Sequence, residues 1–366
     1  MIGTRPEAIK LVPVAHSLAR AGAAVHLYFT GQHPGLEPAA HGLDAFPCTP
    51  LQQPGLPDPH EHVDRVANGL ARIWKFRGPD MVMVQGDTSS ALGGARAAVA
   101  SGIPLAHVEA GLRSFDSRQP WPEEDFRIEI DRVSDLLFAP TSTSASNLIS
   151  ERCQGQVHIT GNTGIDAGVA DRGLPGKAPR HWPAGRFNIL VTCHRRENWG
   201  VGFAAVSAAL VELTRRPRIR IDVVLHPNPR VSEAMFEQLG HNASIRLLPP
   251  LSHAAMLEAM LRSDLILSDS GGVQEEAPTL GVPLLVLRDK TERPEGVEQG
   301  AMRLVGTDSR RIIASVDEIA GDRKLRANMS QQRFPFGDGQ AAPRIAAAAL
   351  QWLDREYRDR SEPRRA

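Results

Sequence analysis

The chain has 366 residues, which exceeds the roughly 100–200 residues of one ordinary domain, so we expect two domains. Its 42% hydrophobic and 23% charged residues are typical of a soluble globular protein. Because 42 basic residues balance 42 acidic ones, the formal net charge is zero, and neither a nucleic-acid surface nor a membrane surface is indicated.

The three cysteines, Cys48, Cys153 and Cys193, are odd in number and lack metal-ligand spacing. This pattern supports neither a disulfide framework nor a metal site, and a reducing cytoplasm fits it best. No apolar run approaches the ~20 residues of a membrane span, and the N-terminus lacks the pattern of a signal peptide.

The first residues read as a strand-to-helix turn, with Thr4 as the helix N-cap and Pro6 in the first helical turn. Only Met1 and Ile2 precede this turn, whereas a doubly wound sheet normally has a full central strand there. We therefore expect that the sequence begins several residues late.

Residues 1–170 are predicted to form a first Rossmann-like domain with a parallel, doubly wound sheet. Strand-like apolar runs alternate with amphipathic helical stretches, which is the pattern of such a sheet. The runs lie at 23–29, 81–85, 103–108 and 135–139.

Three carboxylates follow these strands. Asp87 and Glu109 are separated by one helix and one strand, so we expect both at the carboxyl ends of neighbouring parallel strands; Glu123 comes shortly after. A single acid in such a place is more often a helix cap, and this alternative stays open for Asp87. Three together favour acid–base catalysis.

Residues 171–186 are rich in proline and glycine and have no hydrophobic periodicity, so they are predicted to be a linker. A second Rossmann-like domain is predicted at 187–340, and a last helix at 341–358 could pack on either domain, including back on the first. The strands expected in the second domain lie at 188–192, 219–225, 245–248, 265–267 and 283–287.

The segment Ser270, Gly271 and Gly272 follows a predicted strand and opens a helix. Backbone N–H groups at such a helix start can bind a diphosphate, and Glu276, one turn on, could bind ribose hydroxyls. The alternative is an ordinary capped helix.

Basic residues also follow strands. His194 stands with two arginines at the end of a strand in the second domain, where ligand contact is a better explanation than a structural role. Arg5 and Arg293 occupy matching loops of the two domains, which favours phosphate recognition over the surface ion pair that a single arginine usually forms.

The ordered motifs of the chain closely resemble those of the non-hydrolysing UDP-N-acetylglucosamine 2-epimerases. The matching motifs run from Gly3 to about Trp352: GTRPEAIK, TGQH, GDT, HVEAGLR, PWPEE, FAPT, ITGNT, HRREN, DSGGVQEEAP, RDKTERPE and FPFGDGQA.

The resemblance implies a glycosyltransferase-B-like architecture of two Rossmann-like domains facing a cleft, active as a homodimer. It implies interconversion of UDP-GlcNAc and UDP-ManNAc through elimination of UDP to 2-acetamidoglucal and re-addition. No redox cofactor takes part, which agrees with the absence of a GxGxxG motif between a strand and a helix.

By motif match, the resemblance assigns four catalytic residues and seven substrate contacts. Glu109 and Glu123 are the expected acid–base partners, with Asp87 close to the sugar and His194 near the diphosphate. The substrate contacts are Arg5, Lys10, Ser270, Gly271, Gly272, Glu276 and Arg293.

Some positions bear on finer properties. Gln32 and His33 adjoin the activator site of members that a second UDP-GlcNAc activates, but the proline-rich segment 34–59 departs from the usual pattern and argues against activation. Phe126 replaces the usual asparagine after PEE, which would remove a hydrogen bond. Cys193 replaces the usual small residue before HRREN.

Three alternatives remain from the sequence. A hydrolysing relative would release free ManNAc or a related sugar with stoichiometric UDP. A retaining glycosyltransferase would need an acceptor site, and the matched acids argue against it. A sugar-nucleotide-binding regulator would have lost those acids, which are present.

Overall fold

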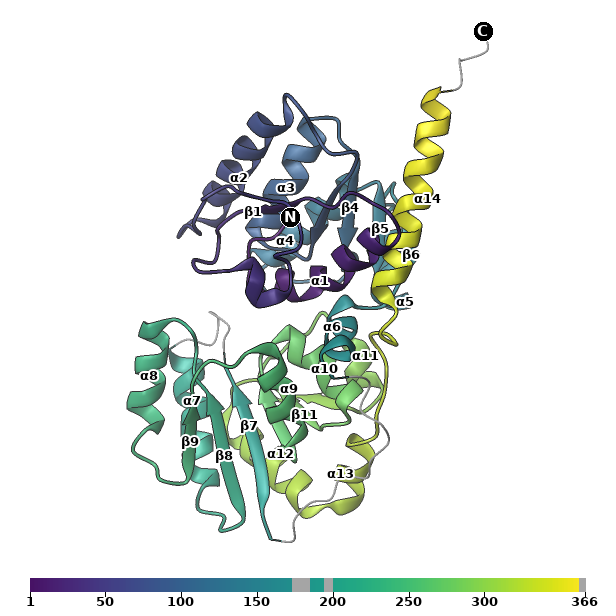
Figure 1. The fold of residues 1–366 in the computed structure, drawn as a ribbon. Coiled ribbons are helices and arrows are strands. Elements are labelled where there is room, and N and C mark those ends of the chain that lie inside the picture. Colours follow the sequence, from purple (N-terminus) through teal and green to yellow (C-terminus); the bar gives the residue numbers. More distant parts are fainter. Residues whose placement is uncertain (173–184, 194–199, 362–366) are drawn as a thin grey trace. The chain divides into compact units, whose positions relative to one another are not determined.

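The computed structural model describes residues 1–172, 185–193 and 200–361 of the chain. Of the predicted linker, 173–184 lie outside the described residues. The structure contains helices and parallel strands throughout (Figure 1). This confirms the prediction of an α/β fold with parallel sheets in two domains.

The chain divides into two compact units, which we call unit 1 and unit 2. Unit 1 contains Met1–Ala170 together with Phe336–Ala366, and unit 2 contains Asp171–Pro335. The chain therefore leaves unit 1 once and returns to it once. Residues 336–340, which the sequence placed in the second domain, lie in unit 1.

Unit 1 is built on short parallel strands. A four-stranded sheet has the order β3-β4-β5-β6, and β1 pairs with β2. The strands are β1 (Leu27–Phe29), β2 (Cys48–Pro50), β3 (Val82–Gln85), β4 (Leu105–Val108), β5 (Leu136–Ala139) and β6 (Gln156–Ile159). The helices are α1 (Arg5–Arg20), η1 (Pro38–His41), α2 (Pro59–Trp74), α3 (Ser89–Ala100), α4 (Glu123–Val133), α5 (Ser142–Ser150), α6 (Thr163–Arg172) and α14 (Ala341–Ser361).

The first residues connect β1 to β3. Ile2 forms a parallel bridge with Phe29, and its N–H donates to the carbonyl of Tyr28 at 2.9 Å. On the other side, the Met1 amine donates to the carbonyl of Met83 at 3.0 Å, and burial lowers the pKa of this amine to about 6. These residues therefore occupy the central strand position that a doubly wound sheet requires.

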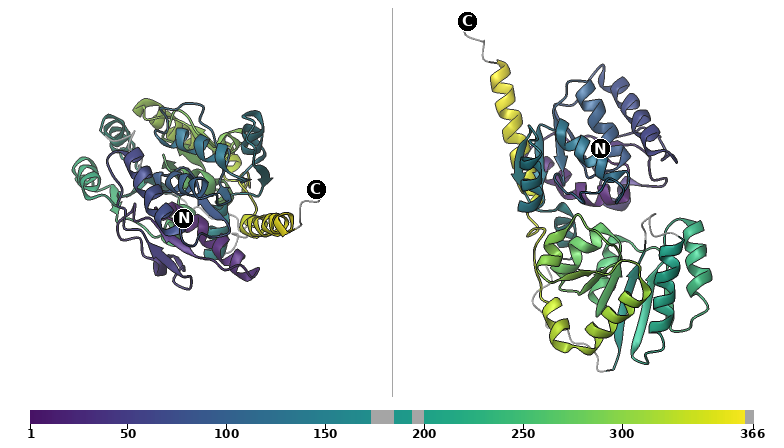
Figure 2. Two further views of the ribbon diagram at one scale, coloured as in Figure 1. Left: turned by 90° about the horizontal axis from the view of Figure 1, so that it is seen from above. Right: turned by 180° about the vertical axis from the view of Figure 1, so that it is seen from behind.

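Helix α14 packs on α1 in unit 1. Ala342 and Ile345 belong to the same core as Phe138 of β5. The carboxylate of Asp166 on α6 caps the helix, because it accepts from the N–H groups of Ala341 at 3.2 Å and Ala342 at 2.7 Å. The views in Figure 2 show that the C-terminal turns of α14 extend beyond the rest of unit 1.

Unit 2 is a doubly wound sheet with all strands parallel. Its order is β12-β11-β10-β7-β8-β9, so the chain winds in both directions from β7. The strands are β7 (Phe187–Thr192), β8 (Ile219–Val224), β9 (Ile245–Leu248), β10 (Leu265–Ser268), β11 (Leu284–Val286) and β12 (Met302–Leu304). The helices are α7 (Val201–Leu213), α8 (Pro229–Leu239), α9 (His253–Leu261), α10 (Gly271–Leu280), α11 (Pro294–Glu298), α12 (Ser309–Gly321) and α13 (Arg323–Met329).

Helices cover both faces of this sheet, so its strands are apolar on both faces. Ile189 and Val191 of β7 pack in the core that contains residues of α7 and α12. Leu190, between them, packs in a second core with residues of α9 and α10. Because β7 and β10 pair in parallel, with Thr192 opposite Ser268, their carboxyl ends lie next to each other at one edge of the sheet.

Two negative findings concern the described residues only. Among the helices of that part of the chain, none has both the length and the apolar character that a membrane crossing requires. Within the same described ranges, no group of three or more His, Cys, Asp or Glu side chains is arranged to hold a metal ion.

Candidate active site

Asp87 and Glu109 follow neighbouring parallel strands, as predicted. Strands β3 and β4 pair in parallel with Gln85 opposite Val108, and α3 connects them. The N-cap of α3 is Thr88, whose side chain accepts from the N–H of Ala91. The capping role left open for Asp87 is therefore filled by its neighbour.

The backbone at Glu109 is unusual. Its φ is 71°, in the left-handed region that non-glycine residues rarely adopt. Two residues later, Gly111 has a φ of 82°, and a Cβ there would come within 2.2 Å of the carbonyl oxygen of Ser144. The turn after β4 thus has a fixed, strained shape that aims the Glu109 side chain.

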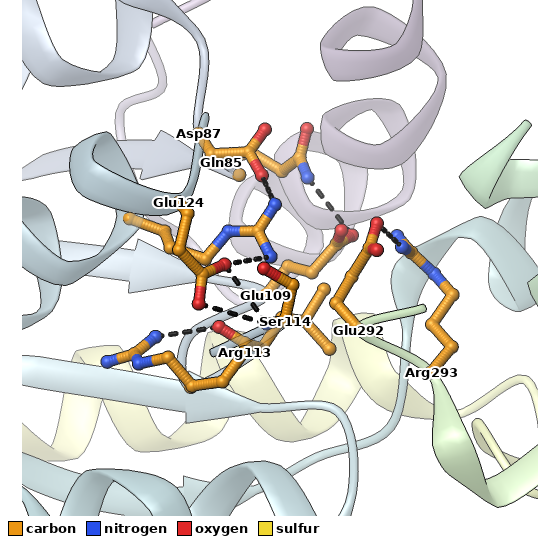
Figure 3. A network of polar contacts seen from close by, with 12 residues as sticks. Gln85, Asp87, Glu109, Arg113, Ser114, Glu124, Glu292 and Arg293 are labelled. Atoms are coloured by element: carbon orange, nitrogen blue, oxygen red, sulfur yellow. Dashed lines mark hydrogen bonds and ion pairs between the residues drawn. The ribbon is translucent and has the colours of Figure 1, made fainter. Parts of the chain in front are cut away.

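Three donors converge on one oxygen of Glu109. Its Oε2 accepts from Lys10 Nζ, from Gln85 Nε2 at 3.1 Å and from Asn162 Nδ2 at 3.3 Å. Figure 3 shows Gln85 reaching Glu109. The Glu109 side chain is 8% exposed. An acceptor of three N–H groups, one of them an ammonium, is an ionised carboxylate.

Asp87 is held by the helix that begins with Glu123. Arg127 of α4 forms an ion pair with Asp87 and donates to Glu124 Oε2 at 3.2 Å. Glu124 in turn accepts from the N–H of Ser114 at 2.9 Å (Figure 3). The Asp87 side chain remains 26% exposed, which leaves it accessible to a small ligand.

Glu123 is the first residue of α4, and the second oxygen of its carboxylate, Oε2, is buried. The negative charge lies at the positive end of the helix dipole. Since Arg127 on the same helix binds Asp87, the structure brings the elements of Asp87 and Glu123 together.

The start of α1 is tied to the start of α3 through Glu7. Its carboxylate accepts from the N–H groups of Gly3 and Thr4 and from Thr88 Oγ1 at 2.7 Å. Despite these bonds, burial raises the pKa of Glu7. Arg5 follows the predicted N-cap Thr4, and its N–H donates to His33 Nδ1 at 3.4 Å.

The two residues proposed for an activator site are bound to the same region of unit 1. Gln32 Oε1 accepts from Ser90 Oγ at 2.6 Å, and the N–H of His33 donates to the carbonyl of Gly3 at 2.9 Å. These contacts fix the TGQH loop beside the first turns of α1 and α3. An activator role for this loop stays a prediction.

In unit 2, Ser270 is the N-cap of α10, and Gly271 and Gly272 are its first residues. Their N–H groups form the helix N-terminus, as expected. Glu276 lies on the same helix, and its Oε1 is 2.7 Å from His253 Nε2.

Arg293 is buried beside this helix. It is 5% exposed, donates from Nε to Glu275 at 2.7 Å and forms an ion pair with Glu292 (Figure 3). The structure therefore places Arg293 among carboxylates, where it supports the start of α10.

Two residues that depart from the family pattern are both buried. Phe126 is 2% exposed, belongs to a core of unit 1 and stacks edge-on against His60, with ring centroids 5.2 Å apart. Cys193 is 1% exposed at the end of β7, and its thiol donates to Asp269 at 3.4 Å. His194 lies outside the described residues.

Several residues of the site were missed in the sequence. Gln85 and Asn162 contact Glu109, Arg127 contacts Asp87, and His253 contacts Glu276. The signal for Gln85 and Asn162 was their position at or just after the ends of β3 and β6, the same signal that identified the acids.

Comparisons with known proteins identify the family. A family model described as UDP-N-acetylglucosamine 2-epimerase matches residues 16–350. The UDP-N-acetylglucosamine 2-epimerase of Salmonella typhimurium is 40% identical over 366 residues, covering 95% of this chain and 96% of that protein. The enzyme of the same name from Yersinia pestis is 38% identical, with the same coverage.

Solved structures agree. The UDP-GlcNAc 2-epimerase from Neisseria meningitidis bound to UDP-GlcNAc has a TM-score of 0.87 at 34% identity, over 96% of this chain and 98% of that chain. The Methanocaldococcus jannaschii enzyme in complex with UDP-GlcNAc and UDP has a TM-score of 0.83 at 32% identity, with the same coverage. The resemblance inferred from the motifs is confirmed: the chain belongs to the UDP-N-acetylglucosamine 2-epimerase family of isomerases.

Proposed function

We propose that this protein inverts C2 by eliminating UDP and adding it back at C1 while C2 regains a proton on the face opposite the one it lost. In the elimination the C2–H and C1–O bonds break, the C2–H electron pair forms the C1=C2 bond of 2-acetamidoglucal, and UDP leaves with the C1–O pair. In the re-addition, UDP forms the C1–O bond again and the C1=C2 electron pair takes up a proton at C2 from the opposite face, so UDP-GlcNAc and UDP-ManNAc interconvert.

The observation that carries this proposal is the set of donors on Glu109. The C2 proton becomes acidic only as the C1–O bond loosens, and an ionised carboxylate must then accept it. Lys10, Gln85 and Asn162 keep Glu109 in that form. Glu123 is the proposed partner that exchanges a proton on the other face, and Asp87 lies close to the sugar.

The leaving diphosphate needs stabilisation as its negative charge develops. We assign this role to the N–H groups of Ser270, Gly271 and Gly272 at the start of α10, and to Arg5. Arg293 supports this helix start from its buried site against Gly271.

The remaining substrate contacts rest on the motif match. Glu276 is proposed to bind the ribose hydroxyls in place of His253, its present partner. His194 is proposed to lie near the diphosphate. Gln32 and His33 are candidates for contacts to a second nucleotide sugar, and hyperbolic kinetics with UDP-ManNAc as the sole substrate would contradict that role.

A homodimer and a cytoplasmic location belong to the same proposal. The cysteines Cys48, Cys153 and Cys193 are thiols in the structure, which supports a reducing compartment. Light scattering of the purified chain measures the oligomeric state, and a monomer at working concentration contradicts the dimer.

The test is to incubate the protein with UDP-GlcNAc in D2O and to follow the C2 and anomeric signals by NMR. Deuterium at C2 together with UDP-ManNAc supports the epimerase. Stoichiometric free UDP with free sugar favours the hydrolysing alternative instead, and absence of both deuterium and product refutes the proposal.

Variants separate catalysis from binding. Glu109→Gln and Glu123→Gln are expected to abolish exchange while UDP still binds. Glu129→Gln is the matched control, because Glu129 lies on α4 with Glu123 but pairs with Arg96 on the surface. Exchange retained in Glu109→Gln would overturn the role of Glu109.

A further inference from the structure

A group of charged side chains is buried beneath the turn that carries Glu109. His107 of β4 and Asp131 of α4 have completely buried side chains, and the side chain of Arg113 is 1% exposed. Burying a charge is costly unless it is paired and hydrogen-bonded. We therefore expect these buried side chains to be paired and hydrogen-bonded, and they are.

Asp131 is ionised in this group. Its Oδ2 accepts from Arg113 Nη1 at 2.8 Å and from the N–H of Gly111 at 3.1 Å. Burial alone raises the pKa of Asp131, but the charges of His107 and Arg113 and their hydrogen bonds outweigh burial, and the net effect lowers it. Oδ1 is then left as an acceptor for His107.

Both ring nitrogens of His107 face acceptors. Nδ1 lies 2.7 Å from Asp131 Oδ1, and Nε2 lies 2.8 Å from the carbonyl oxygen of Gly86. A carbonyl oxygen can only accept, and so can an ionised carboxylate. His107 therefore links the Asp131 carboxylate to the turn after β3 through its two ring nitrogens.

The pair reaches the backbone of every proposed catalytic carboxylate in unit 1. The carbonyl held by His107 belongs to Gly86, which directly precedes Asp87. His107 lies two residues before Glu109, and the N–H held by Asp131 lies two residues after it. Asp131 itself lies on α4, the helix that begins with Glu123.

We propose that Asp131 and His107 are positioning residues that set Asp87, Glu109 and Glu123 in register for the proton transfers at C2. This inference rests on the proposed function. Asp131 is itself a residue of α4. Its carboxylate contacts the turn after β4 directly, at the N–H of Gly111, and the turn after β3 through His107. The left-handed backbone at Glu109 is held from both sides by this arrangement.

The cost of losing this positioning is large because proton transfer depends on close geometry. A displacement of about 1 Å at a reacting group can lower a rate by about 100-fold. Such a displacement is expected to leave most nucleotide binding intact, since the proposed diphosphate contacts other than Arg5 lie in the other unit.

The variants are Asp131→Asn, which keeps the shape and removes the charge, and His107→Gln. Both are expected to lower kcat for C2 exchange by about 100-fold, with KM for UDP-GlcNAc and Kd for UDP changed by less than about threefold. The matched control is Asp135→Asn. Asp135 also binds β4, but at its opposite end, where Oδ2 accepts from the N–H of Leu105 at 2.8 Å.

A purely structural role predicts a different result. In that case Asp131→Asn and Asp135→Asn lower kcat in proportion to their loss of folded protein, which thermal unfolding measures. A large loss of kcat in folded Asp131→Asn, with normal kcat in folded Asp135→Asn, supports positioning. Normal kcat in folded Asp131→Asn overturns it.

Nitrogen-15 NMR of labelled histidine tests the same inference without turnover. We expect the His107 Nδ1 signal to shift in Asp131→Asn, which replaces the carboxylate that Nδ1 contacts, and not in Asp135→Asn. An unmoved Nδ1 signal in Asp131→Asn overturns the proposal. We also expect the amide signals of Asp87 and Glu109 to shift in Asp131→Asn and not in Asp135→Asn, and unmoved signals contradict it.

The turnover and NMR measurements test the proposed function and the positioning role separately. If the wild type shows no C2 exchange, the proposed function fails. The positioning of the three carboxylates is then still decided by the His107 Nδ1 signal and by the amide signals of Asp87 and Glu109.

Discussion

The guanidinium of Arg293 lies against the backbone of Gly271, where any other residue would place its side chain. A Cβ at position 271 would come within 2.9 Å of Arg293 Cζ and 3.0 Å of both terminal nitrogens. Arg293 cannot move away freely, because it is buried and bound to Glu275 and Glu292. Glycine at 271 is therefore a packing requirement.

Gly271→Ala is expected to lower the free energy of unfolding by roughly 1–3 kcal/mol, because overpacking displaces Arg293. Gly272→Ala is the control, since the nearest atom to its Cβ would be Ser270 Oγ at 3.9 Å. Alanine is the better helix former, so this control should be neutral or more stable by up to about 1 kcal/mol. Urea unfolding measures both, and equal stabilities would contradict the prediction.

The left-handed backbone at Glu109 is expected to lower the stability of the folded protein. Glu109→Gly and Glu109→Ala both remove the carboxylate that pairs with Lys10. A φ near 71° is unfavourable for alanine but not for glycine, so only the alanine variant retains this conformational strain. Glycine gains more conformational freedom in the unfolded chain, which offsets part of this difference. The glycine variant should be more stable by about 1 kcal/mol in urea unfolding, although both lack activity. An alanine variant of equal or greater stability would show that the turn is relaxed.

The motif resemblance predicts asparagine at position 126, yet replacing Phe126 with asparagine should destabilise this protein. The ring is buried in a core of unit 1 and stacks on His60. Phe126→Asn should lower the free energy of unfolding by about 3–5 kcal/mol, since it removes this packing and buries an amide. Phe126→Leu serves as the milder comparison, and denaturant unfolding measures both. An asparagine variant as stable as the wild type would mean that the site accepts either residue.

Asp131 makes a prediction about pH. The pKa of Asp131 is lower in the folded protein than in the unfolded chain. Ionised Asp131 therefore contributes its full stabilisation at any pH above the pKa of the unfolded state. That contribution is lost as the pH falls through the folded pKa. The difference in unfolding free energy between wild type and Asp131→Asn should be full above the unfolded pKa of aspartate, about 3.9, and should shrink as the pH falls through the lower folded pKa. Comparing the two proteins cancels the contribution of Glu7, whose pKa is raised by burial. A difference that does not change with pH would contradict the assignment.

Much of the fold could be predicted because it depends on local patterns. The N-cap Thr4 and the step from β3 through α3 to β4 are confirmed. The strand expected at 23–29 is shorter, at Leu27–Phe29. Strand β2 was missed because it is largely exposed and ends in a proline, and such a short edge strand has no apolar alternation to detect.

The parts of the site that could not be predicted depend on contacts between distant residues. His107 and Asp131 are 24 positions apart, and Glu109 and Asn162 are 53 apart. In the sequence, His107 is one polar residue inside an apolar strand, and Asp131 is one acid on a charged helix. Neither pattern indicates a partner, because pairing is decided by how α4 packs on the sheet.

The return of the chain to unit 1 has a consequence for synthesis. Unit 2 is one continuous stretch, but the core of unit 1 needs Ala342, Ile345 and Ala349 from the end of the chain. A ribosome adding about 5–20 residues per second needs on the order of 10–30 s to make the intervening unit. During that time α14 has not been made, so the apolar surface of α1 that it covers lacks its cover until unit 2 has been synthesised.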